Sequence, residues 1–414
     1  MANRPIPRIR LSLPVSSLVG FFKSLAREPK PSEAKDWVTR FETAFAARYD
    51  LGPGVACSRA RIAFYYLLKH LPLEPGGEVL ISAIHVADFV NVIRLAGFVP
   101  KVVDLLPNSL ELDYEDLEAK LNARSQLFVV THLSGYGHDM ARLCKISADR
   151  GVPFVEDCSQ SINSRYQGQR LGTFGVASFF SLSLIKEVCT LMGGMVLSKD
   201  QALLERIRQD QSTLPEQPLG PLKAEATKNL ILHLAVSPAL FLLATFPTLR
   251  LTRSLGDLFA SYQKTNKTVV LRDQLPPGML VRFSWRQAKM GLEQLETVDQ
   301  RTEQRKKKGY DLYQRLLPLT SLRLPREAPG TERSAWLFPV FCEHPDRLAQ
   351  HLAAYGIDTA PMLLSHMPSE PAFAALGLEA PRAKEMRGQI LFVPMYSDLT
   401  QAELERIAQA IEAF

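Results

Sequence analysis

The stretch from residue 152 to residue 197 reads VPFVEDCSQSINSRYQGQRLGTFGVASFFSLSLIKEVCTLMGGMVL, and it decides the fold class. It contains three short runs rich in β-branched and aromatic residues, which predict buried strands. The runs cover residues 152–156, 176–180 and 195–197. Polar residues follow the first two runs directly, with Asp157 after one and Lys186 shortly after the other. Ligands of parallel sheets bind beyond the carboxyl ends of the strands, so chemistry is expected at these positions.

The same alternation continues toward the N-terminus. Further strands are predicted at residues 78–82, 99–104 and 126–132, and helices at residues 59–70, 87–96 and 113–121. Strands that alternate with amphipathic helices are typical of a parallel sheet covered by helices. We therefore predict an α/β fold with a doubly wound, mostly parallel sheet.

The C-terminal part predicts a smaller α+β unit. We expect one long helix over residues 286–315, strands at 336–341 and 390–393, and helices at 345–355 and 400–413. The run Arg305-Lys306-Lys307-Lys308 lies in the long helix and is interpreted as a solvent-facing surface, so no nucleic-acid partner is expected.

Four regions follow from these patterns. They are a basic N-terminal arm (1–35), a large cofactor-binding domain (36–220), an apolar segment with basic flanks (221–262) and a small C-terminal domain (263–414).

Composition narrows the class of protein. The chain has 414 residues, of which 46% are hydrophobic, and its net charge of +6 is too small to indicate a nucleic-acid-binding protein by itself. The five cysteines are scattered without the spacing of a zinc or redox pair. We expect no metal site and no disulfide framework, which fits a cytoplasmic protein.

Residues 229–249 (NLILHLAVSPALFLLATFPTL) carry no Asp, Glu, Lys or Arg. Pro238 and Pro247 disfavour a continuous spanning helix. Three interpretations stay open: buried helices or an oligomer interface, a helix lying on a membrane surface beside its basic flanks, or a true span.

Asp157 and Lys186 suggest a specific chemistry. A lysine and a carboxylate at neighbouring strand ends are what an enzyme that uses pyridoxal 5'-phosphate (PLP) requires. The lysine binds the cofactor covalently, and the carboxylate keeps the ring nitrogen protonated. The residues alone also allow an exposed loop lysine and a helix-capping aspartate.

Further motifs resemble the DegT/DnrJ/StrS family of sugar aminotransferases, over nearly the whole chain from residue 41. The matching segments are EPGGEVL (74–80), AGFVPKVVD (96–104), residues 154–172, SLSLIK (181–186) and RFSWRQAKMGLEQL (282–295). This resemblance implies a fold-type I aminotransferase, with a large-domain sheet of seven-stranded type, a small α+β domain and a homodimer whose sites are shared between subunits.

The resemblance also implies roles for single residues. Lys186 corresponds to the catalytic lysine and Asp157 to the partner of the ring nitrogen. Gln160 corresponds to a residue near the ring hydroxyl, and Ser181 to a phosphate-binding hydroxyl. The family's phosphate cradle at a helix N-terminus corresponds to Ser58-Arg59-Ala60-Arg61.

Three positions depart from the family pattern. Ala60 and Arg61 replace a glycine and a threonine of the cradle, so a guanidinium becomes available where close backbone approach is usual. Leu280 replaces an asparagine that the partner subunit supplies to the phosphate. The aromatic residue that stacks on the ring falls near Val86, and its neighbour His85 is the candidate instead.

We therefore expect a PLP-dependent aminotransferase that moves an amino group from an amino acid, by family likeness glutamate, to a keto sugar. The family's acceptors are commonly nucleotide-linked and serve polysaccharide or natural-product biosynthesis. One alternative is a membrane-associated aminotransferase with a lipid-linked or amphiphilic acceptor. An alternative of another class is a non-catalytic regulatory or assembly protein that retains the fold.

Overall fold

The computed structural model describes residues 4–252 and 269–414, and these contain a central sheet of seven strands. The strands in spatial order are β1 (Val55–Cys57), β10 (Gly194–Leu197), β9 (Ala177–Ser181), β6 (Phe154–Asp157), β5 (Ser125–Thr131), β2 (Glu78–Ser82) and β4 (Val99–Val103). Only the pairs of β10 with β1 and with β9 are antiparallel. The predicted α/β fold with a mostly parallel sheet is thus confirmed. Six of its strands lie within two residues of their expected bounds, and the edge strand β1 was not predicted.

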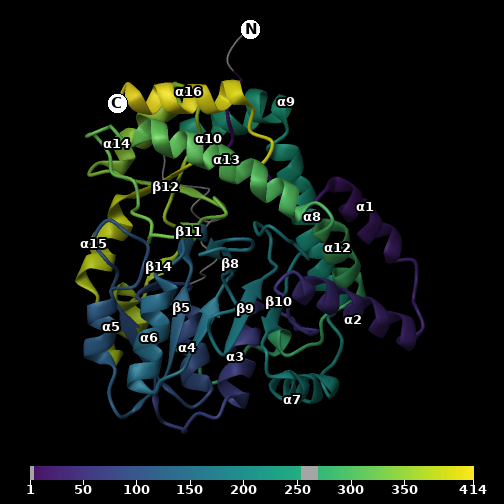
Figure 1. Cartoon of the computed structure of the whole chain (residues 1–414). Helices are drawn as coiled ribbons and strands as arrows, with labels where there is room; N and C mark the ends of the chain where they lie inside the picture. Colours follow the sequence, from purple (N-terminus) through teal and green to yellow (C-terminus); the bar gives the residue numbers. More distant parts are fainter. Residues whose placement is uncertain (1–3, 253–268) are drawn as a thin grey trace.

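Helices enclose this sheet in the lower part of Figure 1. They are α3 (Ala60–His70), α4 (Asp88–Leu95), α5 (Tyr114–Lys120), α6 (Met140–Arg150) and α7 (Gln201–Ser212). Asp113 caps α5 by accepting the backbone N–H groups of Glu115 and Asp116, as its position before an amphipathic stretch predicts. The buried faces meet in one continuous apolar core, so the strand ends are held rigidly.

The C-terminal unit has a small sheet with helices against it. Its elements are β12 (Phe338–Phe341), β13 (Ala360–Pro361), β15 (Ile390–Val393), α14 (Pro345–Ala354), α15 (Pro381–Gln389) and α16 (Gln401–Glu412). Shorter elements join it to the large domain. The strands are β3 (Ile84–His85) with β14 (Ser365–His366), and β7 (Arg165–Tyr166) between β8 (Gln169–Arg170) and β11 (Thr331–Glu332). The 3₁₀ turns are η1 (Leu133–Gly135), η3 (Pro277–Met279), η4 (Met367–Ser369) and η5 (Pro371–Leu376).

The expectation of one long helix over residues 286–315 is wrong. The structure has two helices, α12 (Trp285–Leu295) and α13 (Val298–Leu316). The backbone N–H of Thr297 bonds to the carbonyl of Gln294, which tightens the last turn and ends α12. The break lets α12 pack on α2 (Pro31–Ala47) while α13 packs on α16.

The interpretation of the basic run in α13 as wholly solvent-facing is also wrong at its first residue. Arg305 is only 5% exposed and forms an ion pair with the buried Glu187. Lys306 pairs with Glu303 and Glu332 at the surface.

Residues 229–249 lie in a bent helical segment rather than in the core. The segment comprises α8 (Leu219–Ala235), α9 (Pro238–Leu240), the π-helical turn η2 (Phe241–Thr245) and α10 (Phe246–Thr252). In the described part of the chain no single helix has the length and apolarity of a membrane span, although α8 and Pro238–Leu251, bent by 63°, meet those criteria together. Within one chain, burial explains only part of this composition: Phe241, Phe246 and Leu249 are buried together, whereas Leu243 is 76% exposed and Ile231 is 59% exposed. Of the three interpretations, the oligomer interface and the membrane surface both require such exposed side chains.

The N-terminal arm reaches the C-terminal unit before it forms a helix. Ile6 makes a parallel bridge with Ile357, and α1 (Val15–Ser24) then packs against α8. Figure 1 shows purple α1 beside teal α8 at the edge of the molecule.

Candidate active site

Asp157 is the last residue of β6, and its carboxylate is held from two directions. One oxygen accepts a hydrogen bond from His85 Nε2 at 2.8 Å, and the other accepts the backbone N–H of Ser159 at 2.9 Å. Burial raises the pKa of Asp157, but the contacts with His85 and Ser159 outweigh that effect and hold the pKa below its usual value. Asp157 is therefore a fixed, ionised carboxylate at the carboxyl edge of the sheet.

Lys186 lies in the loop between β9 and β10. Its Nζ sits 4.1 Å from the centroid of the Trp336 ring, and Trp336 Nε1 donates to the carbonyl of Ile185 at 3.0 Å. Burial lowers the pKa of Lys186 to about 8, against the opposing effect of the negative charge of Asp157. β6 and β9 are parallel neighbours in the sheet, so Asp157 and Lys186 belong to adjacent strand ends.

Trp336 is a site residue that the sequence reasoning missed. It comes from the small domain, 150 positions after Lys186, and no local pattern links the two. A tryptophan just before a short strand was the only available signal.

The N-terminus of α3 lies beside β10. A Cβ atom on Gly194 would come within 2.7 Å of the backbone nitrogen of Ala60, so only glycine allows this approach. Gly194 thus lets β10 pack closely against the start of α3, whereas the effect of Ala60 on the approach to a phosphate stays a prediction. In the first turn of α3 the N–H groups of Ile62 and Ala63 bond to the carbonyl of Arg59, whereas those of Ala60 and Arg61 have no partner within the helix. Such free N–H groups favour an anion.

Side chains around this helix start are already engaged. Ser58 Oγ donates to the carbonyl of Met279, and Arg59 Nη1 donates to the carbonyl of Ser58 at 2.6 Å. Arg61 forms an ion pair with Asp88, so its guanidinium is not free in this structure as the sequence analysis expected. Contacts from these residues to a phosphate stay predictions.

Gln160 and Ser181 flank the same strand ends. Gln160 Oε1 accepts the backbone N–H of Ser134 at 2.7 Å, which stabilises the left-handed backbone of Ser134 (φ 57°). Ser181 Oγ lies 3.0 Å from Ser183 Oγ at the end of β9. His85 forms the hydrogen bond to Asp157 and contacts Phe89, and its expected stacking on a cofactor ring stays a prediction.

The residues present fit PLP on one structural ground. Within the described ranges, several buried polar atoms near the carboxyl ends of β2, β5 and β6 have no hydrogen-bond partner, and four of them are relevant here. They are Ser82 Oγ, His85 Nδ1, Thr131 Oγ1 and Ser159 Oγ. Unpartnered buried polar atoms are costly, and a polar cofactor would offer them partners.

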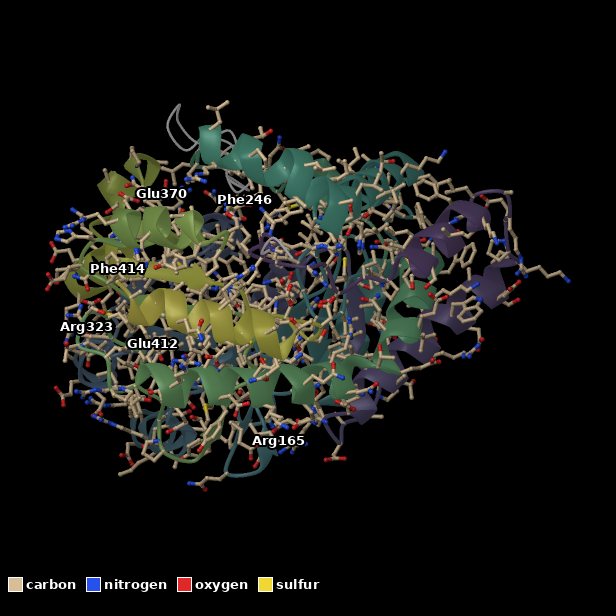
Figure 2. All side chains as sticks on the ribbon, turned by 90° about the horizontal axis from the view of Figure 1, so that it is seen from above. Arg165, Phe246, Arg323, Glu370, Glu412 and Phe414 are labelled. Atoms are coloured by element: carbon tan, nitrogen blue, oxygen red, sulfur yellow. The ribbon has the colours of Figure 1, made fainter. Side chains whose placement is uncertain are left out.

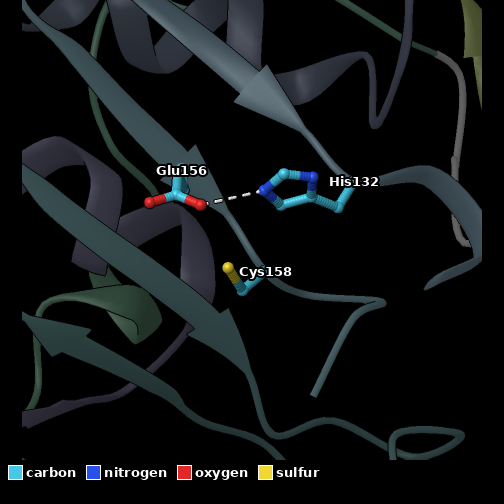
Figure 3. Close-up of side chains that lie close together, drawn as sticks. All are labelled: His132, Glu156 and Cys158. Atoms are coloured by element: carbon cyan, nitrogen blue, oxygen red, sulfur yellow. Dashed lines mark hydrogen bonds and ion pairs between the residues drawn. The ribbon is translucent and has the colours of Figure 1, made fainter. Parts of the chain in front are cut away.

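A second carboxylate, Glu156, points away from this site. Figure 3 shows it beside His132 and Cys158, and ligand atoms of the three residues lie within 4.8 Å of one another. Glu156 accepts backbone N–H groups of Gly172, Phe174 and Gly175 at 2.6 to 2.9 Å, and His132 Nε2 at 3.1 Å. Burial and the charge of Glu156 raise the pKa of the Cys158 thiol well above its usual value. A saturated carboxylate and a protonated thiol are poor metal ligands, so we assign this cluster to holding the loop at 172–175.

Replacing Glu156 with glutamine is expected to lower the free energy of unfolding by about 3–5 kcal/mol, the usual cost of breaking a buried charged contact. The amide would present an N–H group to backbone N–H donors. Urea denaturation checks this, with the exposed Glu343→Gln as the control for loss of one charge. Equal stability of the two variants would contradict the role given to Glu156.

Comparison with known proteins connects this geometry to a family. The model of the DegT/DnrJ/EryC1/StrS aminotransferase family matches residues 31–233 and 244–412. The chain belongs to this family. The resemblance inferred from the sequence motifs is thereby confirmed, and the family match leaves out residues 234–243, where α8 gives way to α9.

Curated family members include two GDP-perosamine synthases. The one from Escherichia coli O157:H7 is 29% identical over 175 residues, which are 42% of this chain and 48% of that protein. The one from Caulobacter vibrioides is 24% identical over 383 residues, covering 91% of this chain and 89% of that protein. In the first of these matches the chain spans about half the length of its relative.

Solved structures of the family confirm the fold-type I architecture. The sugar aminotransferase CalS13 from Micromonospora echinospora superposes with a TM-score of 0.73 at 22% identity, covering 99% of each chain. AtS13 from Actinomadura melliaura superposes with a TM-score of 0.76 at 20% identity, covering all of both chains. At this identity the likeness establishes the fold alone.

Proposed function

We propose that this protein is a PLP-dependent aminotransferase that moves an amino group from glutamate to the keto carbon of a nucleotide-linked sugar. The observation that carries the proposal is the pair formed by Asp157 and Lys186 at neighbouring strand ends, beside buried polar atoms without partners. Membership of an aminotransferase family supports the reaction class. The GDP-perosamine synthases among its relatives support the acceptor class.

PLP, when bound, supplies an aromatic ring that accepts the electron pair left on a substrate carbon. Asp157 would hold a proton on the ring nitrogen, and His85 and the Ser159 N–H keep its carboxylate in place for that task. The first turn of α3 would bind the phosphate through its backbone N–H groups. Trp336 covers the amine of Lys186 and limits the access of water.

Lys186 would carry the proton between the substrate carbon and the cofactor. Its pKa of about 8 suits this role, because a group close to neutral pH both accepts and releases a proton readily. An ordinary lysine holds its proton too tightly at the same pH.

Absorption of the purified protein tests the proposal. Added PLP is expected to give a near-visible band that glutamate bleaches and that GDP-4-keto-6-deoxymannose, offered as a model acceptor, restores. Absence of any band at every cofactor concentration would overturn the proposal and favour the non-catalytic alternative. A band that glutamate bleaches but this acceptor does not restore would contradict only a GDP-linked acceptor.

We also propose that the enzyme works as a homodimer, as its family membership suggests. A second candidate function keeps the same chemistry but places the enzyme at a membrane, with an amphiphilic acceptor. The exposed leucines of α8 to α10 favour it. The vesicle experiments described below test this contact.

A further inference from the structure

A pocket of about 350 Å³ lies beside α13, outside the residues of the candidate active site. Four segments form its walls: the N-terminal arm, the break between α8 and α9, α13, and residues 396–398. Its volume is within the range of small-molecule sites. The α8–α9 break is also where the family match is interrupted, so the pocket includes a feature particular to this chain.

The walls carry more positive than negative charge. Arg10 pairs with Asp398 at 2.6 Å, and Arg305 pairs with Glu187. Arg301 donates only to backbone carbonyls, of Ser12 at 2.7 Å and of Glu187 at 3.0 Å. Among the described residues no carboxylate pairs with Arg301, so one guanidinium charge at the pocket has no counter-charge.

Hydrogen-bond donors of these walls also lack partners. The Nε atoms of Arg10, Arg301 and Arg305, and the hydroxyl of Tyr396, are buried without a hydrogen bond in the described part of the chain. Arg305 is only 5% exposed, so water does not readily supply the missing hydrogen bond to its Nε atom. The guanidinium of Arg301, which has no counter-charge, indicates that an anion would complete the site.

We propose that this pocket binds the phosphate group of an anionic lipid headgroup at a membrane surface. A phosphate group fits this pocket because one guanidinium can donate two parallel hydrogen bonds to phosphate oxygens, and these charge-assisted bonds are short. Ser12, Ser237 and Ser397 line the same space, and Ser237 Oγ donates to the carbonyl of Leu234 at 2.6 Å, so its oxygen is fixed at the pocket wall.

The helices around the pocket favour a lipid over a soluble phosphate. Leu234 and Leu240, which flank the α8–α9 break, are 52% and 45% exposed, and Leu243 one turn further on is 76% exposed. Residues 226–256 contain Lys228, Arg250 and Arg253 but no Asp or Glu. Apolar side chains beside cations are typical of helices that lie on anionic membranes.

A second copy of the chain explains this surface less well, because pairing the segment with itself would bring like charges together. Figure 2 shows the teal helices along one border of the molecule, with Phe246 on their inner side. The border is thus formed by a narrow row of helices that continues to α1, where Val15, Val19 and Phe22 are exposed.

This inference rests on the membrane-associated form of the proposed function. It does not depend on which sugar accepts the amino group. Arg301 and Arg305 also hold Glu187, the neighbour of Lys186, so replacing them would disturb the active site as well. Ser237 is the better position for a test. It precedes α9, where Asp and Asn are both accepted as capping residues, so both variants should fold.

The experiment compares Ser237→Asp with Ser237→Asn in the full-length protein. We expect the wild type and Ser237→Asn to co-sediment with phosphatidylcholine vesicles that contain phosphatidic acid. Ser237→Asp places a negative charge beside the guanidinium groups and should bind them at least about tenfold more weakly. Thermal unfolding of both variants confirms that they are folded.

Three results would overturn the inference. They are equal vesicle binding by the two variants, equal binding of the wild type to vesicles of phosphatidylcholine alone, and stabilisation by pyrophosphate without any vesicle binding. The last result would indicate a soluble phosphate ligand. If Leu243→Gln abolishes vesicle binding and Ser237→Asp leaves it intact, the protein contacts the membrane but the pocket does not bind the lipid headgroup. The absorption experiment tests the aminotransferase itself independently.

Discussion

Replacement of Lys186 with alanine is expected to lower the rate of amino transfer by about 10⁴-fold, the upper range for loss of a general acid–base group. The variant loses both the covalent attachment of the cofactor and the group that moves the proton. Single-turnover reaction with glutamate measures the rate. Borohydride reduction and peptide mapping should place the cofactor mass on the peptide containing residue 186 in the wild type only.

Lys186→Arg serves as the control for charge. Arginine keeps a cation over the ring of Trp336 but cannot lose its proton, so it should be as inactive as alanine. Activity in either variant above about 1% of wild type would remove Lys186 from the chemistry.

The pKa of Lys186 predicts the pH dependence of cofactor capture. Only the neutral amine attacks the cofactor, and a pKa of about 8 leaves about a quarter of it neutral at pH 7.5. A lysine with its usual pKa near 10.5 would be only about 0.1% neutral there. The capture rate should therefore rise with pH and level off above about pH 8 to 9.

Six strands of the large domain could be predicted from sequence because most of their residues are buried and apolar, whereas the three-residue edge strand β1 was missed. The run at 78–82 shows this, since all five of its residues are buried in β2. The division at Thr297 could not be predicted, because both halves of residues 286–315 have helical periodicity and only their different packing partners separate them.

Part of the candidate active site could also be predicted, because two of its residues lie close to predicted strands. Asp157 ends one strand and Lys186 lies in the loop after the next, so their positions in sequence place them at the carboxyl edge of the sheet. Glu156 and Asp157 are neighbours in one strand, so their side chains point to opposite faces of the sheet. The alternation in a strand does not tell which of the two side chains faces the ligand. Trp336, the pairing of Arg61 with Asp88 and the burial of Arg305 all depend on contacts between distant segments.

Asp157→Asn is expected to lower kcat by about 10²–10³-fold, as for loss of one preorganised electrostatic contact, while the cofactor still binds. Asparagine can still accept the Ser159 N–H, but it lacks the negative charge that keeps a proton on the ring nitrogen. The measurement is kcat for glutamate, with the exposed Asp311→Asn as the control for removal of one carboxylate.

A cofactor analogue separates loss of charge from loss of structure. PLP methylated at the ring nitrogen carries a permanent positive charge and does not need a carboxylate to hold a proton there. It should restore much of the activity of Asp157→Asn while leaving Lys186→Ala inactive. If both variants stay inactive with the analogue, Asp157 acts by holding His85 and the strand end in place rather than through its charge.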